Sequence, residues 1–134
     1  MKNFLRVSFL AVGVLLPTFV MAHEGHDQPP GQIASQNGGA VKPGGQLNME
    51  MVNEGSKVSF YPISHSGEKI PLADVKVTAT AQAPKGKPLP VKLEGTGDAF
   101  VGTVDLSSAI RSTVEVKASY KGKSDTFKFQ VEKQ

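Results

Sequence analysis

The residues with the clearest chemical potential lie together near the amino terminus. The run His23-Glu24-Gly25-His26-Asp27 holds two imidazoles three residues apart and two carboxylates. If the chain is cleaved before His23, this residue also carries a free α-amine, which can close a chelate ring with its own imidazole on a divalent ion. An α-amine titrates at about pH 8 and an imidazole at about pH 6.5, so neutral nitrogen ligands are available near neutral pH.

Nitrogen donors with carboxylate support suit Cu(II), Ni(II) or Zn(II). We therefore predict a metal site made by His23 and His26, with Glu24 and Asp27 as auxiliary oxygen ligands. Its affinity is expected to be modest, because a disordered site must be ordered when the ion binds. The alternative is a polar, solvated tail with no ligand.

A second hypothesis uses softer donors. Met49 and Met51 are expected on one strand face, and His65 follows the neighbouring strand. Thioethers favour Cu(I), so these three residues are a second candidate set. If Glu54-Gly55 forms the hairpin loop, however, Met49 faces Phe60 and Met51 faces Val58, which describes a core face where Met is ordinary filler.

The sequence indicates no enzyme. The chain has no Cys and three His, so thiolate chemistry and disulfides are excluded. Ser64-His65-Ser66 places hydroxyls beside an imidazole, but neighbours in sequence rarely have triad geometry. The spacing of His23 and His26 is not that of the H-E-x-x-H zinc-protease motif. Lysine-rich stretches alternate with apolar residues, so we expect solvated faces and no nucleic-acid partner.

The first 22 residues predict export. Lys2 and Arg6 precede an apolar run at 9–20, and Val20-Met21-Ala22 offers small or aliphatic side chains for a signal peptidase. This pattern is typical of a cleaved secretory signal over residues 1–22, and we expect a periplasmic protein. The run is about 12 residues, whereas a spanning helix needs about 20. No membrane span is expected after cleavage.

The elements that must position these residues begin after a polar segment. Residues 23–45 are dominated by Gly, Pro, Gln, Asn and Ser, a composition that buries too little apolar surface to offset its ordering entropy. We predict a flexible tail over this range, with Val41 as the point where it could join a sheet.

From residue 46 to 134 the pattern has period two. About seven short apolar-polar alternations are separated by turn residues every 8–12 positions, and none shows a sustained helical period. This pattern predicts an all-β domain, an immunoglobulin-like antiparallel β-sandwich of about seven strands. Residues 46–52 are expected to form an edge strand because a flexible tail precedes them.

The layout resembles a known family. A signal, a His-Glu-Gly-His-Asp start, the pairs Gly38-Gly39 and Gly44-Gly45 and a small β domain are similar to periplasmic heavy-metal-associated proteins and to N-terminal extensions of membrane-fusion subunits of cation-efflux pumps. The segment 58–71 is similar to the strand, turn and following proline of these families, with His65-Ser66-Gly67 in place of their acidic turn. Copper-resistance sandwiches, which are loosely similar, bind Cu(II) through a mature N-terminal His, the counterpart of His23.

Two functions follow from these observations. The resemblance implies a periplasmic protein that binds or buffers copper or zinc and works with an efflux system or another periplasmic protein. The competing function is an interaction module without metal, in which an exposed edge strand of the sandwich adds to a protein partner and the tail is a tether.

Overall fold

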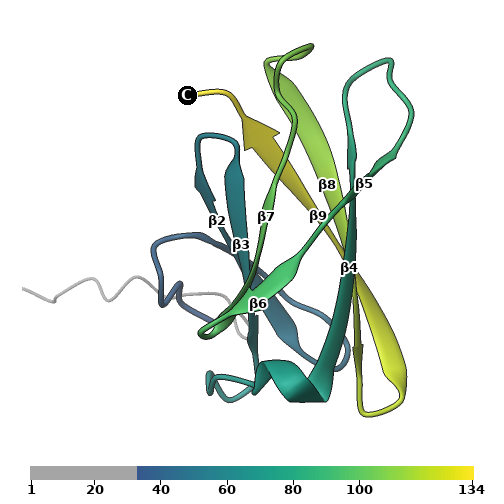
Figure 1. The fold of residues 1–134 in the computed structure, drawn as a ribbon. Helices are drawn as coiled ribbons and strands as arrows, with labels where there is room; N and C mark the ends of the chain where they lie inside the picture. Colours follow the sequence, from purple (N-terminus) through teal and green to yellow (C-terminus); the bar gives the residue numbers. More distant parts are fainter. Residues whose placement is uncertain (1–32) are drawn as a thin grey trace, which may run out of the picture.

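The computed structural model describes residues 33–134 (Figure 1), and these residues form two facing antiparallel sheets. Sheet A has the strand order β1-β2-β3-β7-β6, and sheet B has the order β5-β4-β8-β9. The predicted all-β sandwich is therefore confirmed. The elements are β1 (Ala40–Lys42), β2 (Asn48–Glu54), β3 (Lys57–Ile63), a 3-10 turn η1 (Leu72–Asp74), β4 (Val75–Gln82), β5 (Leu89–Val91), β6 (Glu94–Thr96), β7 (Ala99–Thr103), β8 (Arg111–Tyr120) and β9 (Lys123–Glu132).

The hydrophobic core lies between the sheets and follows the alternation of the sequence. The rings of Phe60 from sheet A and Phe129 from sheet B approach with centroids 5.9 Å apart, and both side chains are fully buried. Burial of each large apolar side chain stabilises the fold by roughly 1.5–3 kcal/mol. With no disulfide available, this core carries the stability of the sandwich.

The longest hairpin of the described residues joins β8 to β9. Strands β8 and β9 pair over ten positions and are joined by Lys121-Gly122. Both loop residues have positive φ, +52° and +77°. A two-residue loop with two positive φ values is a type I′ turn, whose twist matches that of the flanking strands.

The β2–β3 hairpin corrects the predicted register. The loop is Gly55-Ser56 rather than Glu54-Gly55, so Met49 lies opposite Pro62 and Met51 opposite Phe60. Gly55 has a φ of +63° and Ser56 has no positive φ. A type II′ turn needs glycine at its first central position, which explains why the loop starts one residue later than predicted.

The strand count also differs from the predicted seven. Residues 89–96 form two short strands, β5 in sheet B and β6 in sheet A, so the chain changes sheets at Lys92-Leu93. A Cβ on Gly102 would lie 2.8 Å from both the Leu93 side chain and the Lys92 carbonyl oxygen, so the crossing packs directly on this glycine.

The remaining extra strand, β1, begins the sheet earlier than the expected boundary at residue 46. Val41 lies opposite Glu50, and β1 pairs with Met49 to Met51 of β2. The sequence predicted that residues 46–52 form an edge strand. This prediction is wrong for residues 49–51, because β1 lies beside them. The edges are β1 and β6 in sheet A and β5 and β9 in sheet B.

Candidate functional site

The predicted N-terminal metal motif precedes the described part of the chain. His23, Glu24, His26 and Asp27 lie outside the described residues, which begin at Ile33. The first described segment, residues 33–39, crosses the outer face of sheet A, and we call it the strap. It follows the predicted metal motif in the sequence, and its anchoring determines where the described chain begins on the sandwich.

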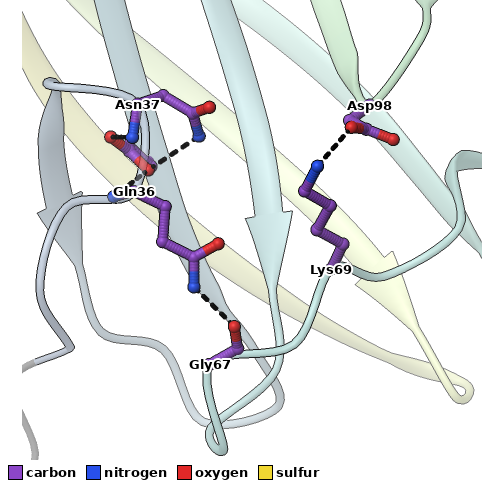
Figure 2. Close-up of polar contacts among 6 residues, drawn as sticks. Gln36, Asn37, Gly67, Lys69 and Asp98 are labelled. Atoms are coloured by element: carbon purple, nitrogen blue, oxygen red, sulfur yellow. Dashed lines mark hydrogen bonds and ion pairs between the residues drawn. The ribbon is translucent and has the colours of Figure 1, made fainter.

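One buried carboxylate anchors the strap. Glu50 of β2 is completely shielded from solvent, and its side chain accepts five hydrogen bonds from strap residues. The donors are the Ser35 hydroxyl at 2.6 Å, the backbone N–H groups of Gln36 at 3.1 Å, Asn37 at 2.9 Å and Gly39 at 2.9 Å, and the Asn37 side-chain amide at 3.1 Å. Figure 2 shows Gln36 and Asn37 of the strap with their bonds.

The charge of Glu50 is stabilised by these donors. Burial of the carboxylate raises its pKa, but the hydrogen bonds from Ser35 and from the backbone of Gly39, Asn37 and Gln36 outweigh it, so the pKa lies below its ordinary value of 4.5. Donors that bond only the ionised form favour that form. Glu50 is therefore a carboxylate at neutral pH, and its bonds to the strap are charge-assisted.

The strap passes so close to the sheet that it requires glycine. A Cβ on Gly39 would overlap the backbone carbonyl group of Met51. Gly39 also donates its N–H to Glu50. Close approach of the two backbones explains why a glycine ends the strap.

A second carboxylate anchors the chain between β1 and β2. Asp125 at the start of β9 accepts backbone N–H bonds from Gly45 at 3.1 Å, Gln46 at 2.7 Å and Leu47 at 3.1 Å. A Cβ on Gly44 would lie 2.8 Å from this carboxylate, so glycine is needed here too. Glu50 and Asp125 together fix both ends of the segment 35–47.

The 64–68 turn holds His65 in a defined orientation. Ser64 N–H donates to the Glu68 carbonyl at 2.8 Å, Gly67 N–H donates to the Ser64 carbonyl at 2.9 Å, and Glu68 N–H donates to the Ser64 hydroxyl at 3.0 Å. His65 is exposed, and its Nε2 lies 2.8 Å from the Gly44 carbonyl oxygen. Because a carbonyl oxygen can only accept, the neutral ring carries its proton on Nε2 and leaves the lone pair on Nδ1.

The strap and this turn are in contact. The Gln36 side-chain amide donates to the Gly67 carbonyl oxygen, as Figure 2 shows. The Ile33 side chain lies 4.0 Å from the position that a Cβ on Gly67 would occupy. Beyond the turn, Lys69 pairs with Asp98 at 2.7 Å, and both side chains are more than half exposed. The described chain thus begins beside the turn that carries His65.

The predicted soft-metal set is divided between the core and the surface. Met49 and Met51 are buried in the apolar cluster between the sheets, whereas His65 lies in the exposed turn and bonds Gly44. Within residues 33–134, no group of three or more His, Cys, Asp or Glu side chains could hold a metal ion. The described residues offer one oriented nitrogen donor, His65, rather than a complete metal site.

Sequence reasoning missed both anchoring carboxylates. Glu50 alternates with the apolar residues Met49 and Met51, a pattern that by itself indicates an ordinary polar face. The two glycine pairs, Gly38-Gly39 and Gly44-Gly45, were the available signal, since paired glycines mark close backbone approach. They could have indicated that residues 35–47 lie against the sheet.

Comparisons with protein-family models, with curated proteins and with solved structures found no match to this chain. In residues 33–134, no helix has the length and apolar character needed to cross a bilayer.

Proposed function

We propose that this is a periplasmic protein that binds or buffers copper or zinc through His23 and His26, with Glu24 and Asp27 as auxiliary ligands. In this role the protein acts without catalysis and passes the ion to an efflux system or another periplasmic protein. Export through a signal at residues 1–22 is part of the proposal, because it makes His23 the first residue of the mature chain.

The observation that carries the proposal is the anchoring of the segment behind the motif. Eight hydrogen bonds to Glu50 and Asp125 fix residues 35–47. A passive tether needs no such attachment, and burial of the Glu50 carboxylate carries a desolvation cost. The arrangement fixes the place on the sandwich where the described chain begins, seven residues after His26 in the sequence.

The test is calorimetric titration of the chain that begins at His23 with Cu(II) and with Zn(II) near pH 7. A one-to-one isotherm that disappears when residues 23–27 are deleted supports the proposal. A variant with an extra Ala before His23 is the matched control, because it keeps both imidazoles but removes the amine chelate and should bind more weakly. No heat above that of buffer competition would refute the proposal.

The second candidate is docking of a protein partner on the edge strand β9. The Lys133 N–H donates to the Ile110 carbonyl oxygen. Since bonded and non-bonded pairs alternate in an antiparallel ladder, the odd-numbered residues of β9 bond β8. Even-numbered residues of β9 therefore direct their backbone groups to the free edge, where no described strand pairs with them. These residues are Ser124, Thr126, Lys128, Gln130 and Glu132.

A proline substitution at the middle of that edge distinguishes partner docking from metal binding. Lys128→Pro removes an edge N–H that β8 does not use, so the fold should survive while strand addition fails. A pull-down of periplasmic partners with the wild-type chain and with Lys128→Pro, using Thr78→Ala on the central strand β4 as control, makes the comparison. Equal capture by all three chains would exclude docking on β9.

A further inference from the structure

We propose that Asn37 is a site of spontaneous deamidation, and that the carboxylate formed there releases the strap from Glu50. The inference goes beyond the proposed metal binding and does not depend on it, because every residue that it uses lies in the strap or in β2.

The sequence singles out Asn37 among the described asparagines. Asparagine is a chemically labile residue. Its side-chain amide is attacked by the backbone nitrogen of the next residue, and Gly38 has no side chain that hinders this attack. The other two asparagines of residues 33–134 are Asn48 and Asn53, which precede larger residues and lie in the paired strand β2.

The strap leaves the reacting groups accessible. Asn37 and Gly38 are both exposed to solvent. Gly38 has a φ of +79°, and a Cβ built on it would meet no atom within 4 Å. Within residues 33–134, no backbone acceptor outside the strands bonds the Gly38 N–H. The attacking nitrogen is therefore not held in a ladder or shielded by packing.

The reaction consumes one water and releases one ammonia. The Gly38 nitrogen forms a bond to the side-chain carbonyl carbon of Asn37, the bond from that carbon to Nδ2 breaks, and the proton of the Gly38 nitrogen leaves with Nδ2 as ammonia. Water then opens the cyclic imide at either of its two carbonyl carbons. The product is aspartate, or isoaspartate with the main chain routed through the former side chain, and both carry a new carboxylate.

The new carboxylate would stand where the anchor needs a donor. The Asn37 side-chain amide donates to one oxygen of the Glu50 carboxylate at 3.1 Å, and the Asn37 backbone N–H donates to the other at 2.9 Å, as Figure 2 shows. A carboxylate at position 37 has no proton to donate at neutral pH. It also carries the same charge as Glu50, and a charge-changing modification beside an acidic side chain acts by repulsion.

Isoaspartate would disrupt the anchor further. It adds one atom to the main chain between two other donors to the same carboxylate, the N–H groups of Gln36 and Gly39. Gly39 already lies too close to the Met51 carbonyl group to accept a Cβ, so the strap has no room to absorb the extra atom. Neither product reverts to asparagine without an ammonia donor, so the strap stays released.

The first test is incubation of the full chain in warm buffer near pH 8, followed by peptide mass spectrometry and an isoaspartate assay. A synthetic peptide of residues 33–42 gives the rate without the fold. Asn37→Gln is the matched control, because glutamine keeps the amide but forms a larger ring more slowly. We expect the mass gain of deamidation at Asn37 in wild type, with Asn48 and Asn53 unchanged. No gain at Asn37 while the peptide is fully converted would overturn the inference.

The second test measures the effect on the strap. Asn37→Asp introduces the new charge, and Asn37→Ala removes the amide without adding a charge. We expect hydrogen exchange of the Gln36 and Gly39 amides to be about tenfold or more faster in Asn37→Asp than in wild type, less accelerated in Asn37→Ala, and unchanged in the β8–β9 ladder. Unchanged exchange in Asn37→Asp, or equal acceleration in both variants, would contradict release by the new carboxylate.

Discussion

The outer faces of the two sheets have the same alternating sequence pattern but differ in solvent exposure. On sheet B, the outward residues of β4, β8 and β9 are polar, as Lys76, Thr80 and Lys128 illustrate, and all three are exposed. On sheet A, the outward Asn48 and Glu50 of β2 are buried, at 2% and 0% exposure, and the strap lies over Glu50 and bonds its carboxylate. Alternation therefore identifies the face of a residue but not what covers that face.

The covered face carries costs that the bare face avoids. The Asn48 side-chain oxygen has no hydrogen-bond partner among the described residues, and Glu50 exchanges water for five protein donors. These costs arise on sheet A because the strap lies against it, whereas Lys76, Thr80 and Lys128 on sheet B remain in solvent. The predictions below test this contrast, from the largest expected effect to the smallest.

Removal of the Glu50 carboxylate should have the largest effect. Glu50→Ala leaves the strap donors without an acceptor on a covered face, and we expect a loss of about 3 kcal/mol in the free energy of unfolding. Glu132→Ala, the matched change on exposed sheet B, should cost less than about 0.5 kcal/mol. Urea unfolding at pH 7 measures both, and equal losses would end the distinction between the two faces.

Addition of a methyl group beneath the strap should come next. Gly39→Ala forces a Cβ into the Met51 carbonyl group, with an expected loss of about 2 kcal/mol. Gly86→Ala in the β4–β5 loop meets only ordinary contacts at 3.4 Å and should change stability little. The thermal midpoints of the two variants give the comparison, and an unchanged midpoint in Gly39→Ala would show that the strap is not packed as described.

Loss of the second anchor should have a smaller effect, because Asp125 is only partly buried. Asp125→Ala removes the acceptor for three backbone N–H groups that can then turn to water, and we expect a loss of about 1–2 kcal/mol. Hydrogen exchange of Gly45, Gln46 and Leu47 should accelerate selectively. Exchange that accelerates instead throughout β9 would indicate a general defect in the sheet.

The contribution of Glu50 should depend on pH in one direction. Since its folded pKa lies below its ordinary value of 4.5, the ionised group stabilises the fold above that pH, and this contribution is lost as pH falls through the lower, folded value. The stability difference between wild type and Glu50→Gln should therefore be constant from pH 7 to about 5 and shrink in more acidic solution. A difference that grows on acidification would reverse the sign and contradict the assignment.

The exposed pair near the strap should contribute least. Lys69 and Asp98 lie 2.7 Å apart but remain largely in solvent, where side-chain entropy and salt offset their attraction. We expect no resolvable change in the urea midpoint of Lys69→Ala. A clear destabilisation that persists in high salt would show that this pair supports the turn next to the strap.

The features of the fold that the sequence could predict are those made by residues close together in sequence. The β8–β9 hairpin follows from local alternation and Lys121-Gly122, and the buried positions of Met49 and Met51 follow from alternation alone. The anchoring of residues 35–47 could not be predicted, because Glu50 and Asp125 act on donors 11 to 80 residues away in sequence. Composition correctly described that segment as poor in apolar surface, but polar bonds order it.

The central claim is that hydrogen bonds to Glu50 hold the strap against the outer face of sheet A. Hydrogen exchange of the backbone amides of Gln36, Asn37 and Gly39, in wild type and in Glu50→Gln, tests this claim most directly, because these three N–H groups donate to the carboxylate. The account predicts protected amides in wild type and selectively faster exchange of these amides in Glu50→Gln, with the β8–β9 ladder still protected. Amides at these three positions that exchange in wild type at the rate of an unfolded chain would contradict it.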